Sequence, residues 1–407
     1  MTMGLAEGRA ALGRGAWKAA REAFQAALEE GETPEAFEGL GWALFWLDRT
    51  EEGLACRERA FRLHRERGDV RAAARVAWGL AIDGLDFHGA EQAAAWLERA
   101  RRLLEGVETG PERGWVSLWE GHFALMQGRD PARARASGQD ALEIARAEGD
   151  ADLETLAVAL EGLVCVAEGR VEEGMRRVDE AAAAALAGEV RDLDAVGATC
   201  CFLVHACERV RDYDRVSRWA ERVERFSREW GIVPALTVCR TQHAAMLIGR
   251  GEWAAAEEQL QRTIERLSAS RPLLAVEGLE QLAELRRRQG RWEEAEELYA
   301  RVEGRSLALL GRAAIALDRG DTAGTADLLE RFLRRTPPDN WSGRAIALEL
   351  LVRVRLALGQ EAQPALATLR DLADRVPTPM IRGAAALAEG GLAAASLAWD
   401  EARRHHE

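Results

Sequence analysis

The chain has 407 residues, of which 48% are hydrophobic and 30% charged, and its formal net charge is -13. This acidic balance argues against nucleic-acid binding by the chain as a whole, because a phosphate backbone requires a concentrated positive surface. No apolar run follows a basic start, and none approaches the ~20 residues of a membrane span, so we expect no signal peptide and no membrane association. The six cysteines are scattered through helical patterns, which is typical of reduced thiols in a cytoplasm.

One phrase recurs along the chain: a glycine ends a helix, an aromatic residue opens the next, and small residues follow. The clearest copies lie at residues 15–21, 251–257 and 290–299, where Trp17, Trp253 and Trp292 follow the glycine. Degraded copies lie at residues 48–53, 88–93, 128–131, 169–174, 211–216, 320–323 and 359–362. Most steps are about 40 residues long, so each copy indicates the turn of one helical hairpin.

These hairpins predict the fold. No hairpin of this kind covers its own apolar face, so neighbours must stack into a continuous core. Prolines at 34, 111 and 272 fall where first helices of hairpins should begin, and no useful strand alternation occurs. The clearest break, at residues 337–340, indicates a loop rather than a domain linker. We therefore predict an all-α fold, a right-handed superhelical solenoid of about ten hairpins, with residues 1–407 as a single domain.

The recurring phrase resembles the tetratricopeptide repeat. More narrowly, residues 35–43, 207–213 and 282–292 resemble the helical-repeat region of bacterial LuxR-type transcriptional regulators. This resemblance implies a sensor or interaction region of such a regulator. Those regulators end in a helix-turn-helix DNA reader, whereas only a short apolar helix follows residues 390–391 here. We expect neither a DNA-binding nor an ATPase domain within the chain, which is a trimmed regulator, a paralogue without the reader or a free-standing repeat protein.

Catalytic motifs are poorly supported. Lys18 is the only lysine and lies outside any glycine-rich loop, so a phosphate-binding loop has no place. Residues 249–254 match a dinucleotide-binding pattern formally, but they follow an amphipathic helix rather than a strand. No Gly-x-Ser-x-Gly elbow occurs, and Cys201 with His205 lacks a setting that would lower the thiol pKa. We predict a protein that is not an enzyme and carries no cofactor.

Two Cys/His pairs suggest an alternative, a zinc site. Cys201 and His205, like Cys239 and His243, are one helical turn apart on consecutive first helices. When the turns are aligned, however, the two pairs are offset by two residues and point in different directions. We favour buried thiols with hydrogen-bonded histidines and predict no metal.

The groove is the better candidate for a site. In stacked hairpins the first helices line the concave wall, and a fixed register counted back from each turn selects the residues that face it. The selected residues are Glu38, Trp42, Arg75, Trp78, Trp115, His122, Cys201, His205, Glu208, Glu277, Glu280 and Glu284. The early wall is aromatic with a few charges, as at binding hot spots, and the later wall is acidic. As alternatives, the tryptophans pack between hairpins and the acidic row is a solvated face.

These observations favour a non-enzymatic module that binds a peptide, a protein segment or a small effector in its groove, as the sensor of a LuxR-type regulator. One alternative is a scaffold that self-associates through the apolar residues 383–399. A metal-dependent or enzymatic repeat protein is the other.

Overall fold

The computed structural model describes residues 3–107, 110–127, 130–231, 234–303, 305–338 and 340–406, and within these ranges the side chains of all but residues 86, 213, 234–239, 269, 270, 306 and 398–406. The described residues form 21 helices and no strand. The helices are α1 (Met3–Leu12), α2 (Trp17–Glu30), α3 (Pro34–Trp46), α4 (Thr50–Glu66), α5 (Val70–His88), α6 (Ala90–Leu103), α7 (Pro111–Met126), α8 (Pro131–Glu148), α9 (Ala151–Ala167), α10 (Val171–Leu186), α11 (Leu193–Val210), α12 (Tyr213–Trp230), α13 (Pro234–Arg250), α14 (Trp253–Ser270), α15 (Pro272–Arg288), α16 (Trp292–Arg301), α17 (Ser306–Asp318), α18 (Thr322–Arg335), α19 (Trp341–Ala357), α20 (Gln363–Arg375) and α21 (Pro379–His406). Nowhere in these ranges is a helix both long and apolar enough to cross a membrane.

The predicted turns are the hairpin turns of the structure. Trp17, Trp253 and Trp292 are each the first residue of a helix, and the glycine two positions earlier has a positive φ of 70°, 82° and 74° respectively. In two degraded copies a residue other than glycine adopts this conformation, Asp48 at φ 64° and Arg211 at φ 54°. Of the copy at 128–131 and the break at 337–340, residues 128, 129 and 339 lie outside the described residues.

The helices pack as successive pairs, α1 with α2 and so on, and the first helices also contact one another along the array. Small residues permit this close packing. A Cβ on Gly39 of α3 would lie 2.3 Å from Cζ of Phe24, whose fully buried ring comes from α2. The ring therefore occupies the space that the missing side chain leaves between two hairpins. The all-helical solenoid predicted from the sequence is confirmed.

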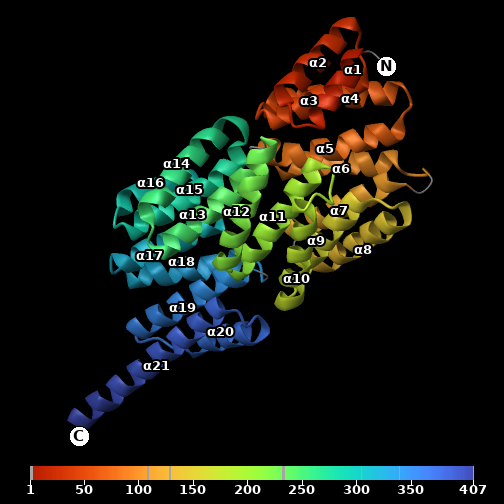
Figure 1. Cartoon of the computed structure of the whole chain (residues 1–407). Helices are drawn as coiled ribbons and strands as arrows, with labels where there is room; N and C mark the ends of the chain where they lie inside the picture. The colour runs from red at the N-terminus through yellow and green to blue at the C-terminus, as the bar shows by residue number, and fades with distance from the viewer. Residues whose placement is uncertain are drawn as a thin grey trace.

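The superhelix brings segments far apart in sequence together. Figure 1 shows the chain running from α1 through α10, crossing at α11 and α12, and continuing through α13–α18 on the other side. The first and middle hairpins meet, because Trp17 Nε1 donates to the Gly231 carbonyl at 3.2 Å and Arg266 Nε lies 3.1 Å from Asp48 Oδ2. These contacts close the concave side of the early hairpins.

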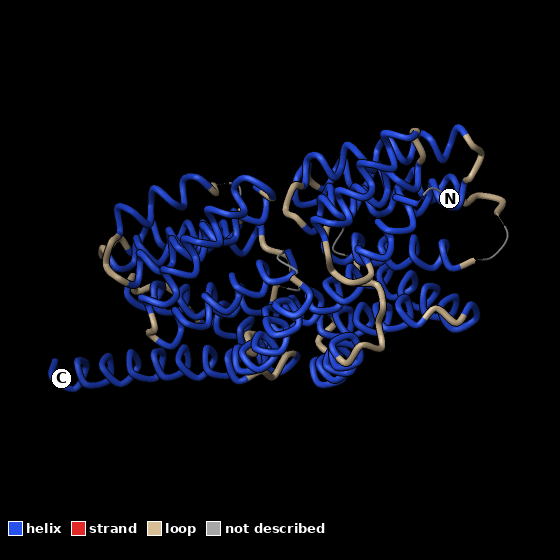
Figure 2. The backbone as a smooth tube through the Cα atoms, turned by 45° about the horizontal axis from the view of Figure 1, so that its top comes forward, coloured by secondary structure: helices blue, strands red, loops and turns tan. Residues whose placement is uncertain are grey.

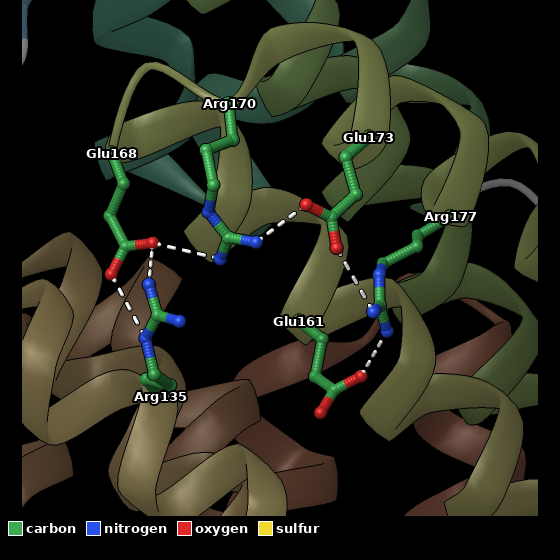
Figure 3. Close-up of polar contacts among 6 residues, drawn as sticks. All are labelled: Arg135, Glu161, Glu168, Arg170, Glu173 and Arg177. Atoms are coloured by element: carbon green, nitrogen blue, oxygen red, sulfur yellow. Dashed lines mark hydrogen bonds and ion pairs between the residues drawn. The ribbon is translucent and has the colours of Figure 1, made fainter.

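Arginine ion pairs join neighbouring helices (Figure 3). Around the α9–α10 turn, Arg170 contacts Glu168 at 3.0 Å and Glu173 at 2.6 Å. Arg177 links Glu173 to Glu161 of α9 at 3.1 and 2.5 Å. Hydrogen bonds from Arg177 and Arg170 lower the pKa of Glu173. The arginine-rich composition therefore supplies forked donors that join helices.

The last helix, α21, extends away from the rest of the molecule (Figure 2). Its start packs on α19 and α20, whereas Leu387 and Leu397 are 69% and 63% exposed. Apolar surface is thus left uncovered towards the chain end.

Candidate ligand-binding cavity

A cavity of about 500 Å³ lies on the concave side of the early hairpins. Its lining comes from the end of α1, the start of α2, the helices α3, α4, α5 and α7, the starts of α9 and α11, and the end of α12. We call it the tryptophan cavity, because seven of the 13 tryptophans line it. Its lining consists of Leu12, Gly13, Trp17, Glu38, Trp42, Trp46, Arg57, Arg75, Val76, Trp78, Gly79, Pro111, Glu112, Trp115, Trp119, Asp150, Asp152, Arg191, Asp192, Leu193, Asp194 and Trp230.

Two stacked indoles form one wall. Trp78 of α5 and Trp115 of α7 have ring centroids 6.2 Å apart and planes 9° from parallel. Trp115 Nε1 donates to Asp150 Oδ2 at 2.9 Å, which fixes the orientation of its ring. Both side chains are half-buried, so part of each ring faces the cavity. The wall is a rigid, flat apolar surface.

A second aromatic group closes the opposite end. Trp42 stacks on Trp46 with centroids 6.4 Å apart, and Trp46 stacks on Trp17 at 5.5 Å. Trp17 is held by its hydrogen bond to the Gly231 carbonyl, next to Trp230. Since Trp46 and Trp17 are buried and Trp42 is half-buried, Trp42 presents the accessible surface of this group.

A buried arginine lies beneath Trp42. Gly41 of α3 and Gly53 of α4 let these helices approach closely, and a Cβ on Gly41 would lie 2.6 Å from Cγ of Arg57. The Arg57 guanidinium lies 3.8 Å from the centroid of the Trp42 ring and forms an ion pair with Asp83. Only 2% of Arg57 is exposed, and its Nε and Nη2 make no hydrogen bond with any described residue. Burial lowers the pKa of Arg57 to about 10, against the opposing effect of nearby carboxylates, chiefly Asp194.

The Glu38 carboxylate is paired within the protein. Arg75 Nε and Nη2 donate to its two oxygens at 3.1 and 3.3 Å, and His64 Nε2 lies 3.6 Å away. Burial of Glu38 favours its neutral form, but His64 and Arg75 outweigh that effect and hold the pKa at about 2. Glu38 is therefore charged and already neutralised.

The starts of α9 and α11 supply aspartates. Asp150 caps α9 by accepting from the Leu153 N–H at 3.0 Å, and Asp192 accepts from the Asp194 N–H at 2.9 Å. Asp152 accepts from the backbone N–H groups of Arg191 and Asp192, at 2.8 and 3.1 Å. Each of these three carboxylates thus has neutral donors as partners, which is usual at helix starts.

Asp194 differs from these three. No hydrogen bond or ion pair joins its carboxylate to another described residue. The Asp194 side chain is half-buried and lies in the lining of the cavity. Burial, together with the neighbouring charge of Asp192, raises the pKa of Asp194 to about 7. The cavity therefore contains a carboxyl group that changes charge near neutral pH.

The structure brings five of the twelve predicted residues to this cavity: Glu38, Trp42, Arg75, Trp78 and Trp115. The three tryptophans are half-buried: they pack against the cores of neighbouring hairpins and also line the cavity.

Four others lie elsewhere, on α7 and α11. His122 is 9% exposed and stacks on Phe202 with centroids 4.8 Å apart, so it belongs to the core rather than to an open wall. Burial lowers its pKa to about 3. Cys201, His205 and Glu208 of α11 are half-buried, and burial lowers the pKa of His205.

The acidic row on α15 is neutralised by arginines and is not a solvated face. Glu280 is 4% exposed and accepts from Arg305 Nε at 2.9 Å, and Glu277 lies 3.9 Å from the same guanidinium. Burial raises the pKa of Glu280, while Arg305 opposes that rise. Glu284 is paired with Arg287 at 2.9 Å. The pairs with Arg305 join α15 to the segment between α16 and α17, whereas the Glu284–Arg287 pair lies within α15.

Sequence reasoning missed Arg57, Asp192 and Asp194. The register counted only along first helices, whereas Arg57 is on the second helix α4, and the aspartates lie at the very start of α11. A signal was present, because the same Asp-x-Asp pattern stands at 150–152 and 192–194, at the starts of two consecutive first helices.

The two Cys/His pairs do not converge on a described site. His243 Nδ1 lies 3.1 Å from Gln259 Oε1, and the side chain of Cys239 lies outside the described residues. Among the side chains that the structure describes, no group of three or more His, Cys, Asp or Glu is placed to hold a metal ion.

A comparison with protein-family models found no match, and neither did a comparison with curated protein sequences. Solved structures do match. A Rap protein complexed with Competence and Sporulation Factor has a TM-score of 0.50 at 12% identity, over 90% of this chain and 99% of that one. Aspartyl phosphate phosphatase F from Bacillus subtilis has a TM-score of 0.49 at 13% identity, over 83% and 94%. The human IFIT1 dimer with m7Gppp-AAAA has 0.47 at 15%, over 92% and 90%. The chain is thus similar in fold to tetratricopeptide-like helical-repeat proteins.

Proposed function

We propose that the protein is a non-enzymatic binding module whose ligand, a small molecule or a short peptide, occupies the tryptophan cavity. The observation that carries this proposal is the gathering of seven tryptophans from five hairpins around a single space of about 500 Å³. Ligand sites are commonly concave, apolar spaces of roughly 300–1,000 Å³ with a few placed polar groups. A ligand that covers the half-buried indoles is bound favourably, because the remaining apolar surface of the rings is removed from water.

The wider role belongs to the same proposal. We infer that residues 1–407 act as one helical-repeat domain and, from the sequence resemblance, as the sensor of a LuxR-type transcriptional regulator in the cytoplasm. The Rap protein of similar fold was solved in complex with Competence and Sporulation Factor, which is consistent with a ligand-holding role for such a superhelix. The Trp17–Gly231 contact joins the first hairpin to a distant one. A bound ligand would favour this closed arrangement, so that ligand binding would also affect distant hairpins.

The test is a binding screen with a matched control. Indole and naphthalene derivatives in cationic, neutral and anionic forms, together with short peptides, are screened by ligand-observed NMR against the protein and two variants. Trp78→Ala removes part of the stacked wall, and Trp253→Ala removes an indole that is 37% exposed at the start of α14, away from the cavity. We expect hits to lose about tenfold or more in affinity with Trp78→Ala and to be unchanged with Trp253→Ala. The proposal fails if no compound binds, or if every hit binds Trp78→Ala undiminished.

A second candidate function is self-association. The exposed leucines of α21 favour it, because uncovered apolar surface on a projecting helix is suited to pairing with a second copy.

A further inference from the structure

The cavity has an unbalanced charge distribution. Six carboxylates line it, against the three guanidinium groups of Arg57, Arg75 and Arg191. Pairs within the protein neutralise two of the six, since Glu38 is bound by Arg75, and Glu112 lies 2.8 Å from Arg71. The four aspartates at the starts of α9 and α11 keep only neutral donors or, at Asp194, none. This side of the cavity is therefore negative, and it is partly screened from bulk water.

The aromatic walls add to the same preference. The face of an indole ring carries negative electrostatic potential, so a cation is attracted to it, most strongly where water is excluded. The protein already uses this attraction, because the Arg57 guanidinium lies 3.8 Å from the Trp42 ring. Trp78 and Trp115 offer similar surface that none of the described cation–ring contacts covers.

Arg57 supplies a second, independent indication of a ligand. Arg57 lines the cavity, only 2% of it is exposed, and its Nε and Nη2 donors have no acceptors among the described residues. Buried donors without partners are rare, because each costs free energy that an acceptor would recover. These nitrogens have almost no accessible surface, so a ligand oxygen reaches them once the covering side chains, among them Trp42, shift. A neutral oxygen then satisfies the donors without bringing a second negative charge next to the aspartates.

We propose that the ligand of the tryptophan cavity is an organic cation: a protonated amine on a flat apolar body, with a neutral acceptor oxygen close to the amine. The amine binds the Asp194 carboxylate, the flat body lies on the Trp78–Trp115 wall, and the oxygen accepts from Arg57. This inference rests on the proposed function and names the chemical class of its ligand. A carboxylate ligand is disfavoured, because it would be placed among unneutralised aspartates.

The first experiment compares probes that share one ring. Calorimetry measures the affinities of tryptamine, its neutral analogue tryptophol and the anion indole-3-propionate. We expect tryptamine to bind about tenfold or more tightly than either, which corresponds to ~1.4 kcal/mol. Tryptophanamide adds a carbonyl oxygen beside the amine and should bind a few-fold more tightly than tryptamine, because the oxygen reaches Arg57.

A matched pair of variants assigns the preference to one carboxylate. Asp194→Asn should reduce the preference for tryptamine over tryptophol to about twofold or less. Asp374→Asn makes the same change at an exposed residue of α20 and should leave the preference unchanged. The inference is overturned if tryptophol or indole-3-propionate binds the cavity as tightly as tryptamine, or if the preference survives Asp194→Asn. In either case the proposed function stands, whereas failure of all probes and of the wider screen removes both.

A pH profile tests the inference on the unaltered protein, whether or not the variant folds. Tryptamine stays protonated between about pH 5.5 and 8.5, so its affinity should rise about tenfold or more as Asp194 loses its proton near pH 7. The charged groups that act on Asp194 are Asp192 at the start of its own helix, Arg57 on α4 and Arg271 before α15, and Asp152 on α9 acts on Asp192. The affinity of tryptophol should stay flat. An equal pH dependence for both probes, or a flat profile for tryptamine, contradicts the assignment of Asp194.

Discussion

Replacing Asp194 with asparagine should stabilise the protein above neutral pH and have little effect in mild acid. The folded protein raises the pKa of this carboxyl from 3.8 to about 7, through burial and the charge of Asp192. Between these two pH values the folded state keeps a proton that the unfolded chain has released. The free energy of unfolding therefore falls as pH rises through this window, and the loss is complete above about pH 7. Asparagine is neutral at every pH and removes this loss.

The size of this stabilisation follows from the shift in the pKa of Asp194. One pKa unit corresponds to about 1.4 kcal/mol, so the charged carboxylate lowers the free energy of unfolding by on the order of 4 kcal/mol above pH 7. An opposing effect is smaller, because an acidic side chain in the first turn of α11 gains only about 0.3–1 kcal/mol from the helix dipole. With an unfolding entropy of roughly 2 cal/mol/K per residue, the net gain raises the melting temperature by on the order of 5 °C.

Thermal unfolding followed by circular dichroism near pH 4.5, 6 and 8 checks this prediction. The difference in melting temperature between Asp194→Asn and the unaltered protein should be small at the lowest pH and grow at each step. Asp374→Asn, at an exposed position, should track the unaltered protein throughout. An Asp194→Asn variant that melts at or below the unaltered protein near pH 8 would refute the reasoning, because the carboxylate would then have a compensating partner.

Two further predictions concern the ends of the superhelix. Asp48→Gly keeps the left-handed turn but removes the ion pairs with Arg266 and Arg271. Small-angle scattering should then show a larger radius of gyration, and the free energy of unfolding should fall by about 1–3 kcal/mol. An unchanged radius would mean that these pairs do not hold the hairpins together. If α21 mediates self-association, light scattering at equal concentration should show fewer copies per particle for a chain ending at residue 378 than for the full chain. An equal number of copies excludes self-association through this helix.

The array of hairpins could be predicted from the sequence because each turn records a local constraint. A left-handed residue must end one helix, and Trp17, Trp253 and Trp292 open the next, so short segments fix the helix boundaries. The same register placed Trp42 and Trp78 on the helix faces that line the cavity, since neighbouring first helices present equivalent faces.

The register was less informative where the superhelix packs against itself. It places His122 on the inner face of α7, but Phe202 from α11 covers that ring. It places Glu280 on the inner face of α15, but Arg305, which precedes α17, covers the carboxylate. Such contacts depend on curvature accumulated over several hairpins, which no single repeat encodes. For the same reason Asp194 was not predicted, because its setting combines α4, the start of α11 and the approach to α15.

The hydrogen bond between Trp17 and Gly231 has a consequence for how the protein is made. The lining of the tryptophan cavity extends from residue 12 to residue 230, so a growing polypeptide has formed most of its hairpins before the cavity is complete. If the proposed ligand binds in this cavity, a chain without the α11–α12 hairpin would lack part of the binding site even though its other hairpins could fold.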